Sequence, residues 1–256
     1  MSFLGRSGTP VPAHLTATCA GKAVHVEVRI SSRARRYTLR VPAGGAPVLT
    51  LPAYFSLRAA RTFLDGHQGW LERELARRPA TRFLEPGELL PVRGIEHRLE
   101  HRPRSRGTTV VYPPGRRPVI AVAGGEEHFR RRLIDWLKRE ARGDLERAAL
   151  RYAKMVGIQP ASVKLRDTKS RWGSCSPSRT LSFSWRLILA PPFVLDYIAA
   201  HEVAHLREMN HGPRFWRLVY KLYPQAREAE DWLRNHGESL YAISTAEVRP
   251  NRRRAA

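Results

Sequence analysis

The sequence predicts an α+β protein in which a strand-rich N-terminal module precedes a domain dominated by helices. Short runs of alternating apolar and polar residues, typical of half-buried strands, recur through the first half of the chain. Longer stretches with apolar residues three and four positions apart, typical of amphipathic helices, fill most of the second half. Gly124-Gly125 stands between the two halves and is a candidate domain boundary.

The first half is expected to hold short strands and one helix. Pro- and Gly-containing turns separate the strand candidates, which cover residues 24–30, 36–41, 48–51, 96–101, 108–112 and 118–122. Ser56 is a candidate N-cap for a helix that continues to about Pro79. Residues 1–20 show no strong pattern and are expected to form a flexible arm.

The second half is expected to begin with a long helix over 126–156 that ends at Gly157. Pro192 suits the start of a later helix, 193–209, which Gly212-Pro213 breaks. The remaining candidates are strands at 163–167 and 181–189 around a polar loop, 168–180, and helices at 214–222 and 225–235. The expected domain organisation is an arm (1–20), a strand-rich module (21–124), a helical domain (125–243) and a basic tail (244–256).

Composition limits the class of protein. The chain has 45 Lys and Arg against 23 Asp and Glu, a net charge of +22. This surplus leaves non-specific nucleic-acid binding open, beside the simpler interpretation that the charge is spread over solvated faces.

Cys19 and Cys175 are too few for a disulfide framework or a cysteine-ligated metal. We expect a cytoplasmic protein, because no apolar run approaches the ~20 residues that span a bilayer and residues 1–12 do not resemble a signal peptide. The oligomeric state cannot be predicted.

One motif indicates metal chemistry. His201-Glu202-Val203-Ala204-His205 has the pattern H-E-x-x-H. Residues four apart lie on one face of a helix, so the two imidazoles can bind one zinc ion. His211, next to the expected helix break, is a third candidate ligand, and three protein ligands with one open position are typical of catalytic zinc. Glu202 is the candidate catalytic base, because zinc lowers the pKa of a coordinated water to about 7.

Alternatives stay open at this motif. Such a pattern also occurs by chance on ordinary helices with solvated histidines, although the apolar flanks here favour a buried helix. Glu208 is an alternative third ligand or a group that orients an imidazole. Zinc is the expected metal, and another divalent ion is not excluded. Cys175 has no supporting motif as a nucleophile.

A second group of residues favours anionic ligands. No acidic residue lies between Asp167 and Asp196. A loop with Gly, Ser and cationic side chains can hold a phosphate or an anionic carbonyl intermediate, although a solvated hairpin packed over Trp172 would have the same sequence. Beside the metal motif, we interpret the loop as a wall of the substrate site. The candidate substrate-binding residues are Lys169, Arg171, Ser174 and Arg186.

Three stretches together resemble the YgjP-like metallopeptidase-domain family, a bacterial zincin-type family related to the SprT and WLM groups. They are RDTKSRWGSC at 166–175, FSWRL at 183–187 and HEVAHLREMNH at 201–211. The likeness is close over about residues 125–240 and looser over about 24–120. It implies a zincin-like domain with an H-E-x-x-H active-site helix, zinc held by the three histidines, and Glu202 as base.

The resemblance implies a hydrolase and leaves its substrate open. A metallopeptidase would take a peptide, which Leu181–Arg186 could hold as an added strand. The family has also been linked to nucleoside triphosphate pyrophosphatase activity, for example UTP to UMP and pyrophosphate, and the loop cations can pair with phosphates. A third alternative is a nucleic-acid-associated metalloprotease or binding module that uses Arg33, Arg35 and Arg36, because related SprT-type proteases act on DNA-bound proteins.

Overall fold

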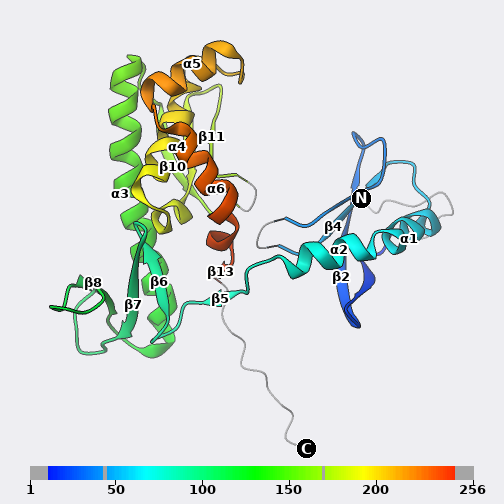
Figure 1. Ribbon diagram of the computed structural model, residues 1–256, viewed down its shortest axis with the longest axis horizontal. Coiled ribbons are helices and arrows are strands. Elements are labelled where there is room, and N and C mark those ends of the chain that lie inside the picture. The colour runs from blue at the N-terminus through cyan, green and yellow to red at the C-terminus, as the bar shows by residue number, and fades with distance from the viewer. Residues whose placement is uncertain (1–10, 43–44, 169–170, 246–256) are drawn as a thin grey trace, which may run out of the picture. The chain divides into compact units, whose positions relative to one another are not determined.

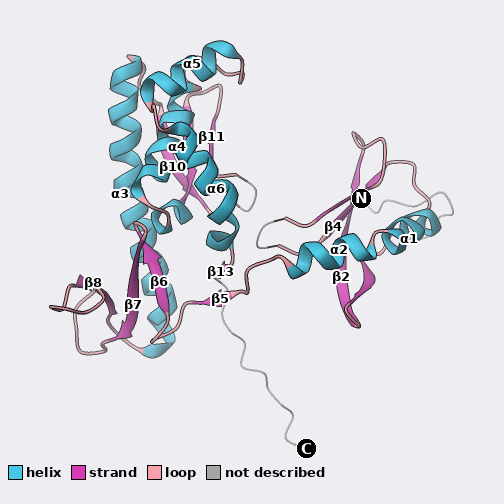
Figure 2. Cartoon of the chain, in the orientation of Figure 1, coloured by secondary structure: helices cyan, strands magenta, loops and turns pink. Residues whose placement is uncertain are grey.

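The computed structural model describes residues 11–42, 45–168 and 171–245, which form a mixed α/β structure with strands first and helices later (Figures 1 and 2). The chain divides into two compact units, Met1–Ala80 and Thr81–Ala256, each with its own core. Gly124-Gly125, the boundary suggested by sequence, lies inside the second unit. The contact boundary thus lies at residues 80–81 and not at 124–125, and independent folding of the predicted ranges remains a prediction.

The first unit has a four-stranded sheet in the order β1-β2-β4-β3. Its strands are β1 (His14–Cys19), β2 (Lys22–Ser31), β3 (Thr38–Arg40) and β4 (Val48–Pro52). Strand β2 pairs antiparallel with β1 and parallel with β4. Val26, Leu49 and Leu51 are fully buried and form the centre of this core. Strands β2, β3 and β4 confirm the strands expected over 24–30, 36–41 and 48–51.

Strand β1 corrects the expectation of a flexible arm over residues 1–20. It buries Leu15, Ala17 and Cys19 on one face against the rest of the core. The alternation is present in the sequence, but its apolar members are mostly small, so the signal was weak. Residues 1–10 lie outside the described residues.

Two helices, α1 (Leu57–Gly66) and α2 (Gln68–Ala76), replace the single helix expected here. Ser56 is confirmed as N-cap, because its side chain accepts a hydrogen bond from the Ala59 N–H at 3.3 Å. His67 interrupts the helix with φ −111° and ψ 9°. Its ring stacks on Phe63 with 4.1 Å between the centroids, and its Nδ1 lies 2.7 Å from the Phe63 carbonyl oxygen, so local contacts stabilise the break.

The second unit begins with short strands. Strand β5 (Arg82–Phe83) pairs with β13 (Ile243–Ser244) near the end of the described chain. A four-stranded sheet in the order β6-β7-β9-β8 follows. Its strands are β6 (Leu89–Val92), β7 (Ile95–His101), β8 (Thr108–Val111) and β9 (Val119–Val122). Strands β7, β8 and β9 confirm the strands expected over 96–101, 108–112 and 118–122. Strands β5 and β6 were not predicted.

Helix α3 (Phe129–Val156) is the long helix expected from the sequence and follows a short 3₁₀ turn, η1 (Glu126–His128). Its buried stripe includes Leu133, Leu137, Leu145 and Ala149, and these residues pack into the core of the second unit. Gly157 ends the helix with φ 75°, a left-handed conformation that costs glycine little. Helix α3 lies alongside α4 in Figure 1.

A three-stranded sheet lies next to these helices, in the order β10-β12-β11. Its strands are β10 (Ser162–Arg166), β11 (Gly173–Cys175) and β12 (Thr180–Ser184). The strand expected over 181–189 was wrong in its second half, because residues from Trp185 to Leu189 form a buried 3₁₀ turn, η2. An apolar run without alternation does not distinguish these alternatives. Strand β11 was not predicted and lies within the expected loop.

Helix α4 (Pro192–Ala204) begins at Pro192 as expected and ends earlier than the predicted Met209. Helices α5 (Pro213–Leu222) and α6 (Ala226–Tyr241) complete the unit. The expected basic tail lies mostly beyond residue 245, outside the described residues. No helix in the described ranges combines the length and apolarity needed to cross a membrane.

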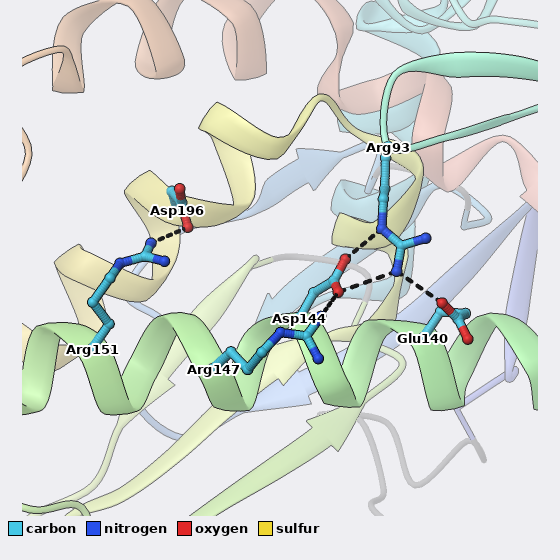
Figure 3. Close-up of polar contacts among 6 residues, drawn as sticks. All are labelled: Arg93, Glu140, Asp144, Arg147, Arg151 and Asp196. Atoms are coloured by element: carbon cyan, nitrogen blue, oxygen red, sulfur yellow. Dashed lines mark hydrogen bonds and ion pairs between the residues drawn. The ribbon is translucent and has the colours of Figure 1, made fainter.

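Ion pairs join the β6–β7 turn and α4 to helix α3 (Figure 3). Arg93, at the turn, donates from Nε to Asp144 at 2.7 Å and from Nη2 to Glu140 at 2.8 Å. Arg151 on α3 donates to Asp196 on α4 at 2.6 Å. The Arg93 N–H also donates to the carbonyl oxygen of Ile188 in η2 at 2.7 Å. These contacts fix the chain just before and within the first turns of α4.

Candidate metal centre

Three histidines meet at the end of α4. His201 and His205 lie one turn apart on the helix, and His211 follows in the turn before α5. His201 Nε2 and His211 Nε2 are 3.1 Å apart, and one donor nitrogen from each of the three rings lies within 4.8 Å of the others. The structure therefore brings together the three ligands predicted from the sequence.

A hydrogen-bonded pair orients the ring of His201. The Tyr197 hydroxyl donates to Glu230 Oε1 at 2.7 Å, and its oxygen lies 3.4 Å from His201 Nδ1. Because that hydroxyl proton is used by Glu230, Nδ1 of His201 is the donor toward Tyr197. This tautomer leaves the Nε2 lone pair of His201 directed at the other histidines, as a metal ligand requires.

His205 has the same arrangement with a different partner. Its Nδ1 lies 3.0 Å from the carbonyl oxygen of Glu208, which accepts the Nδ1 proton and leaves Nε2 unprotonated. The ring of Phe215 stacks on His205 with 4.4 Å between the centroids. Glu208 thus contributes its backbone to this group, and its carboxylate is not among the grouped donor atoms of the described residues.

Glu202 lies beside the histidines with its carboxyl group buried. The residue is 5% exposed, and no described group hydrogen-bonds to its Oε2 atom. Burial raises the pKa of Glu202 to about 8, against an opposing effect of the Arg171 charge. Gly173 of β11 packs directly on this side chain, so a Cβ atom on Gly173 would stand 2.5 Å from Glu202 Cγ.

These residues fit a divalent metal ion. Burial, with repulsion from His205 and His211, lowers the pKa of His201 to about 4, so its ring is neutral near pH 7. His201 Nε2 and His211 Nε2 lie 3.1 Å apart, so both nitrogens can bind one cation. A tetrahedral zinc ion with Zn–N bonds of 2.0–2.1 Å holds its nitrogens about 3.3 Å apart. The Oε2 atom of Glu202 has no hydrogen-bond partner among the described residues and is available to a bound polar group.

Comparison with known proteins identifies the family. The profile of a family described as YgjP-like, metallopeptidase domain, matches residues 35–236, which is more than half of the chain. The chain belongs to this family. The resemblance seen in the sequence is thereby confirmed, and membership of a metallopeptidase family supports a metal-dependent hydrolase.

One solved structure also resembles this YgjP-like chain, the metallopeptidase zymogen abylysin of Pyrococcus abyssi. It is 27% identical, and the likeness covers 37% of this chain and 93% of that one. The TM-score of 0.33 is too low to support an argument about the fold. No match was found among curated proteins.

The candidate substrate residues of the YgjP-like chain lie in different environments. Ser174 is half-buried on β11 opposite Ser182 of β12, and Arg171 is exposed and close enough to lower the pKa of Glu202. Arg186 is only 4% exposed and donates to the carbonyl oxygens of Leu240 and Ile243 and to Asp167. These contacts give Arg186 a structural role. Lys169 lies outside the described residues.

Sequence reasoning missed three residues of this site. Tyr197 lies four positions before His201 on α4, a spacing that puts both on one helix face, and this signal was available. Glu230 comes from α6, 33 residues away from Tyr197, and no local pattern indicates its contact. Gly173 belongs to the segment predicted as a loop, and a glycine beside a predicted active site often marks a close approach of the backbone.

Proposed function

We propose that this protein is a zinc-dependent peptidase with a zincin-like active site, in which His201, His205 and His211 hold the metal and Glu202 is the general base. The observation that carries the proposal is the meeting of the three imidazoles beside a buried carboxyl group whose Oε2 has no partner among the described residues. Membership of a metallopeptidase family supports the same assignment. Two of the imidazoles are held in the ligand tautomer by Tyr197 and by the Glu208 carbonyl.

The protein's own residues supply proton transfer and positioning. Zinc bound at the histidines would polarise the scissile carbonyl and make water a better nucleophile near neutral pH. Glu202 accepts the proton that the attacking water releases and returns it to the leaving amine. Burial makes the carboxylate of Glu202 a stronger base than that of an exposed glutamate, which favours its role as proton acceptor. Gly173 holds the carboxyl group in place from the β11 side.

The sheet suggests where a peptide binds. The sequence predicts an added strand along Leu181–Arg186, but β12 is the central strand and pairs on both sides, so it has no free edge. Strand β11 pairs only with β12 among the described strands, and it is the strand that packs on Glu202. We therefore assign the peptide to the open edge of β11, where backbone groups of the substrate can pair with the strand. Arg171 and Ser174 would then lie on the substrate side.

The test uses full-length protein loaded with zinc. Wild type and Glu202→Gln are incubated with an unfolded protein substrate, and new N-termini are identified by mass spectrometry. Glutamine has nearly the shape of glutamate and cannot act as base, so cleavage should fall by at least about 10²-fold while bound zinc is unchanged. Chelation should abolish cleavage by wild type, and added zinc should restore it.

A parallel measurement addresses the alternative substrate. The same two proteins are incubated with nucleoside triphosphates, and pyrophosphate is measured. The proposal expects pyrophosphate release to be absent, or equal in wild type and Glu202→Gln. Pyrophosphate release that disappears in the variant, without peptide cleavage by wild type, would overturn the peptidase assignment and leave the metal centre in place. Equal peptide cleavage by both proteins would overturn the role of Glu202.

A further inference from the structure

A hollow of about 280 Å³ lies between helix α3 and the end of strand β10, and we call it the α3–β10 hollow. Four cationic side chains line it. They are Lys138, Arg139 and Arg142 on α3, and Arg166 on β10. The lining includes neither the three histidines nor Glu202. The hollow therefore shares no residue with the candidate metal centre.

Three of the four cations of the α3–β10 hollow lack counter-ions within the described part of the chain. Lys138, Arg139 and Arg166 form no ion pair or side-chain hydrogen bond with a described residue. Arg142 pairs with Glu146 at 3.2 Å, but both side chains are about half exposed, and such a pair contributes little to stability. The fold thus gathers positive charge around one hollow and neutralises only part of it.

Two acidic groups close to these cations in sequence have other partners. Asp167, the one carboxylate of the lining, accepts from Arg186 Nε at 2.9 Å. Glu140, on the same helix as three of the cations, accepts from Arg93 at 2.8 Å. Each carboxylate is held by a different arginine, so neither needs to move into the hollow. Gathering like charges without an internal counter-ion is unfavourable, and a bound anion would remove that cost.

One side of the hollow is apolar and packed into the core of the second unit. Trp185 lines it, is 1% exposed, and carries the guanidinium group of Arg186 over its ring at 4.9 Å. Arg186 in turn is anchored to two backbone carbonyl oxygens at 2.7 Å and 2.9 Å. A fixed wall and several cations suit a compact anion with more than one charge. Phosphate groups meet this description, because they have several acceptor oxygens and match the geometry of the guanidinium group.

We propose that the α3–β10 hollow binds phosphate groups, supplied either by a nucleic-acid backbone or by a free polyphosphate compound. Lys138, Arg139 and Arg166 provide the main contacts, and Arg142 contributes a further charge at the rim. The site is independent of the peptidase proposal, since it needs no metal and no residue of the metal centre.

The experiment measures binding of two probes to the full chain, a labelled single-stranded oligonucleotide and inorganic tripolyphosphate. The pocket variant carries Lys138→Gln, Arg139→Gln and Arg166→Gln. The control variant carries Arg104→Gln, Arg106→Gln and Arg227→Gln, which removes the same charge from exposed positions outside the hollow. Zinc binding is measured in both variants as a check of folding, because neither set touches the histidines.

The proposal expects the affinity of the pocket variant for one or both probes to fall at least about tenfold, with the control variant close to wild type. For the oligonucleotide, the slope of log affinity against log salt should also become shallower by about 0.7 for each phosphate that the variant no longer neutralises. Displacement of the oligonucleotide by tripolyphosphate in wild type would identify a free phosphate compound as a competent ligand, and its failure would identify the nucleic-acid backbone. Equal reductions in both variants, or no binding of either probe to wild type, would overturn the proposal.

Discussion

Gly173 lies so close to Glu202 that a Cβ atom on the glycine would stand 2.5 Å from Cγ of the glutamate. This contact joins strand β11, an edge strand of the three-stranded sheet among the described residues, to the helix that carries His201 and His205. Glu202 is buried and has little space to give way. The proposed base and the proposed peptide-binding strand can therefore pack this closely only because residue 173 has no Cβ atom.

Gly173→Ala should therefore reduce turnover without removing the metal. The added methyl group displaces the Glu202 carboxyl group, and small displacements of a catalytic group can cost about 10²-fold in rate. Cleavage rate and bound zinc are measured together. Gly66→Ala is the control, because a Cβ atom at that position meets no atom within 4 Å. An alanine variant at 173 with wild-type turnover would show that the contact has no part in catalysis.

Tyr197→Phe should weaken metal binding. The change removes the hydroxyl oxygen that orients His201 and leaves Glu230 without that donor. Loss of such a supporting group costs about 10–100-fold in metal affinity. Zinc affinity is measured by competition with a chelating dye. Tyr220→Phe, on an exposed tyrosine of α5, should bind zinc as wild type does, and equal affinity in the Tyr197 variant would contradict the proposed role of its hydroxyl group.

His97 should make the free energy of unfolding depend on pH. The residue is 4% exposed, and burial lowers its pKa below the ordinary value of 6.5, with a further contribution from the Arg93 charge. Below about pH 6.5 the unfolded chain binds a proton that the folded chain does not, so stability falls as the pH decreases toward the folded-state pKa. His97→Gln lacks this titration. Urea unfolding at about pH 7.5 and about pH 5.5 should show a smaller difference for the variant than for wild type. Equal differences would show that His97 remains neutral in both states or charged in both.

The ion pairs of Arg93 should stabilise the second unit. Arg93 has φ 52°, a left-handed conformation that is unfavourable for most residues other than glycine, asparagine and aspartate. Arg93→Asn suits that conformation and removes the contacts to Asp144 and Glu140, so any loss of stability reports the ion pairs and not the backbone. We expect the free energy of unfolding to fall by about 1–3 kcal/mol in Arg93→Asn. Arg93 and Asp144 interact directly, so the losses of stability in Arg93→Asn and Asp144→Asn should not add in the double variant. Additive effects would contradict a direct coupling between them.

The histidines could be predicted because their geometry is local. Residues 201 and 205 share a helix face whatever the rest of the fold does, and His211 follows the helix break closely. The position of Glu202 next to the histidines follows from the same helix. The long helix α3 and its end at Gly157 were predicted for a similar reason, since both depend on the residues within a few turns.

Contacts between distant segments could not be predicted. Arg186 was expected to bind substrate because it is cationic and near the metal motif, yet it is buried against backbone carbonyl oxygens of residues 54 and 57 positions later. Nothing near Arg186 in the sequence indicates those carbonyl groups. Strand β11 was hidden for another reason: three residues are too few to show alternation, and only pairing with β12 defines the strand.

The measurement that tests the metal centre most directly is the zinc content of purified full-length protein after equilibration with zinc. The proposal predicts one tightly bound ion per chain in wild type and in Glu202→Gln. It predicts loss of that ion in His201→Ala, His205→Ala and His211→Ala, together with loss of the rise in melting temperature that zinc produces in wild type. A tightly bound ion that persists after all three histidines are replaced would contradict the proposed centre.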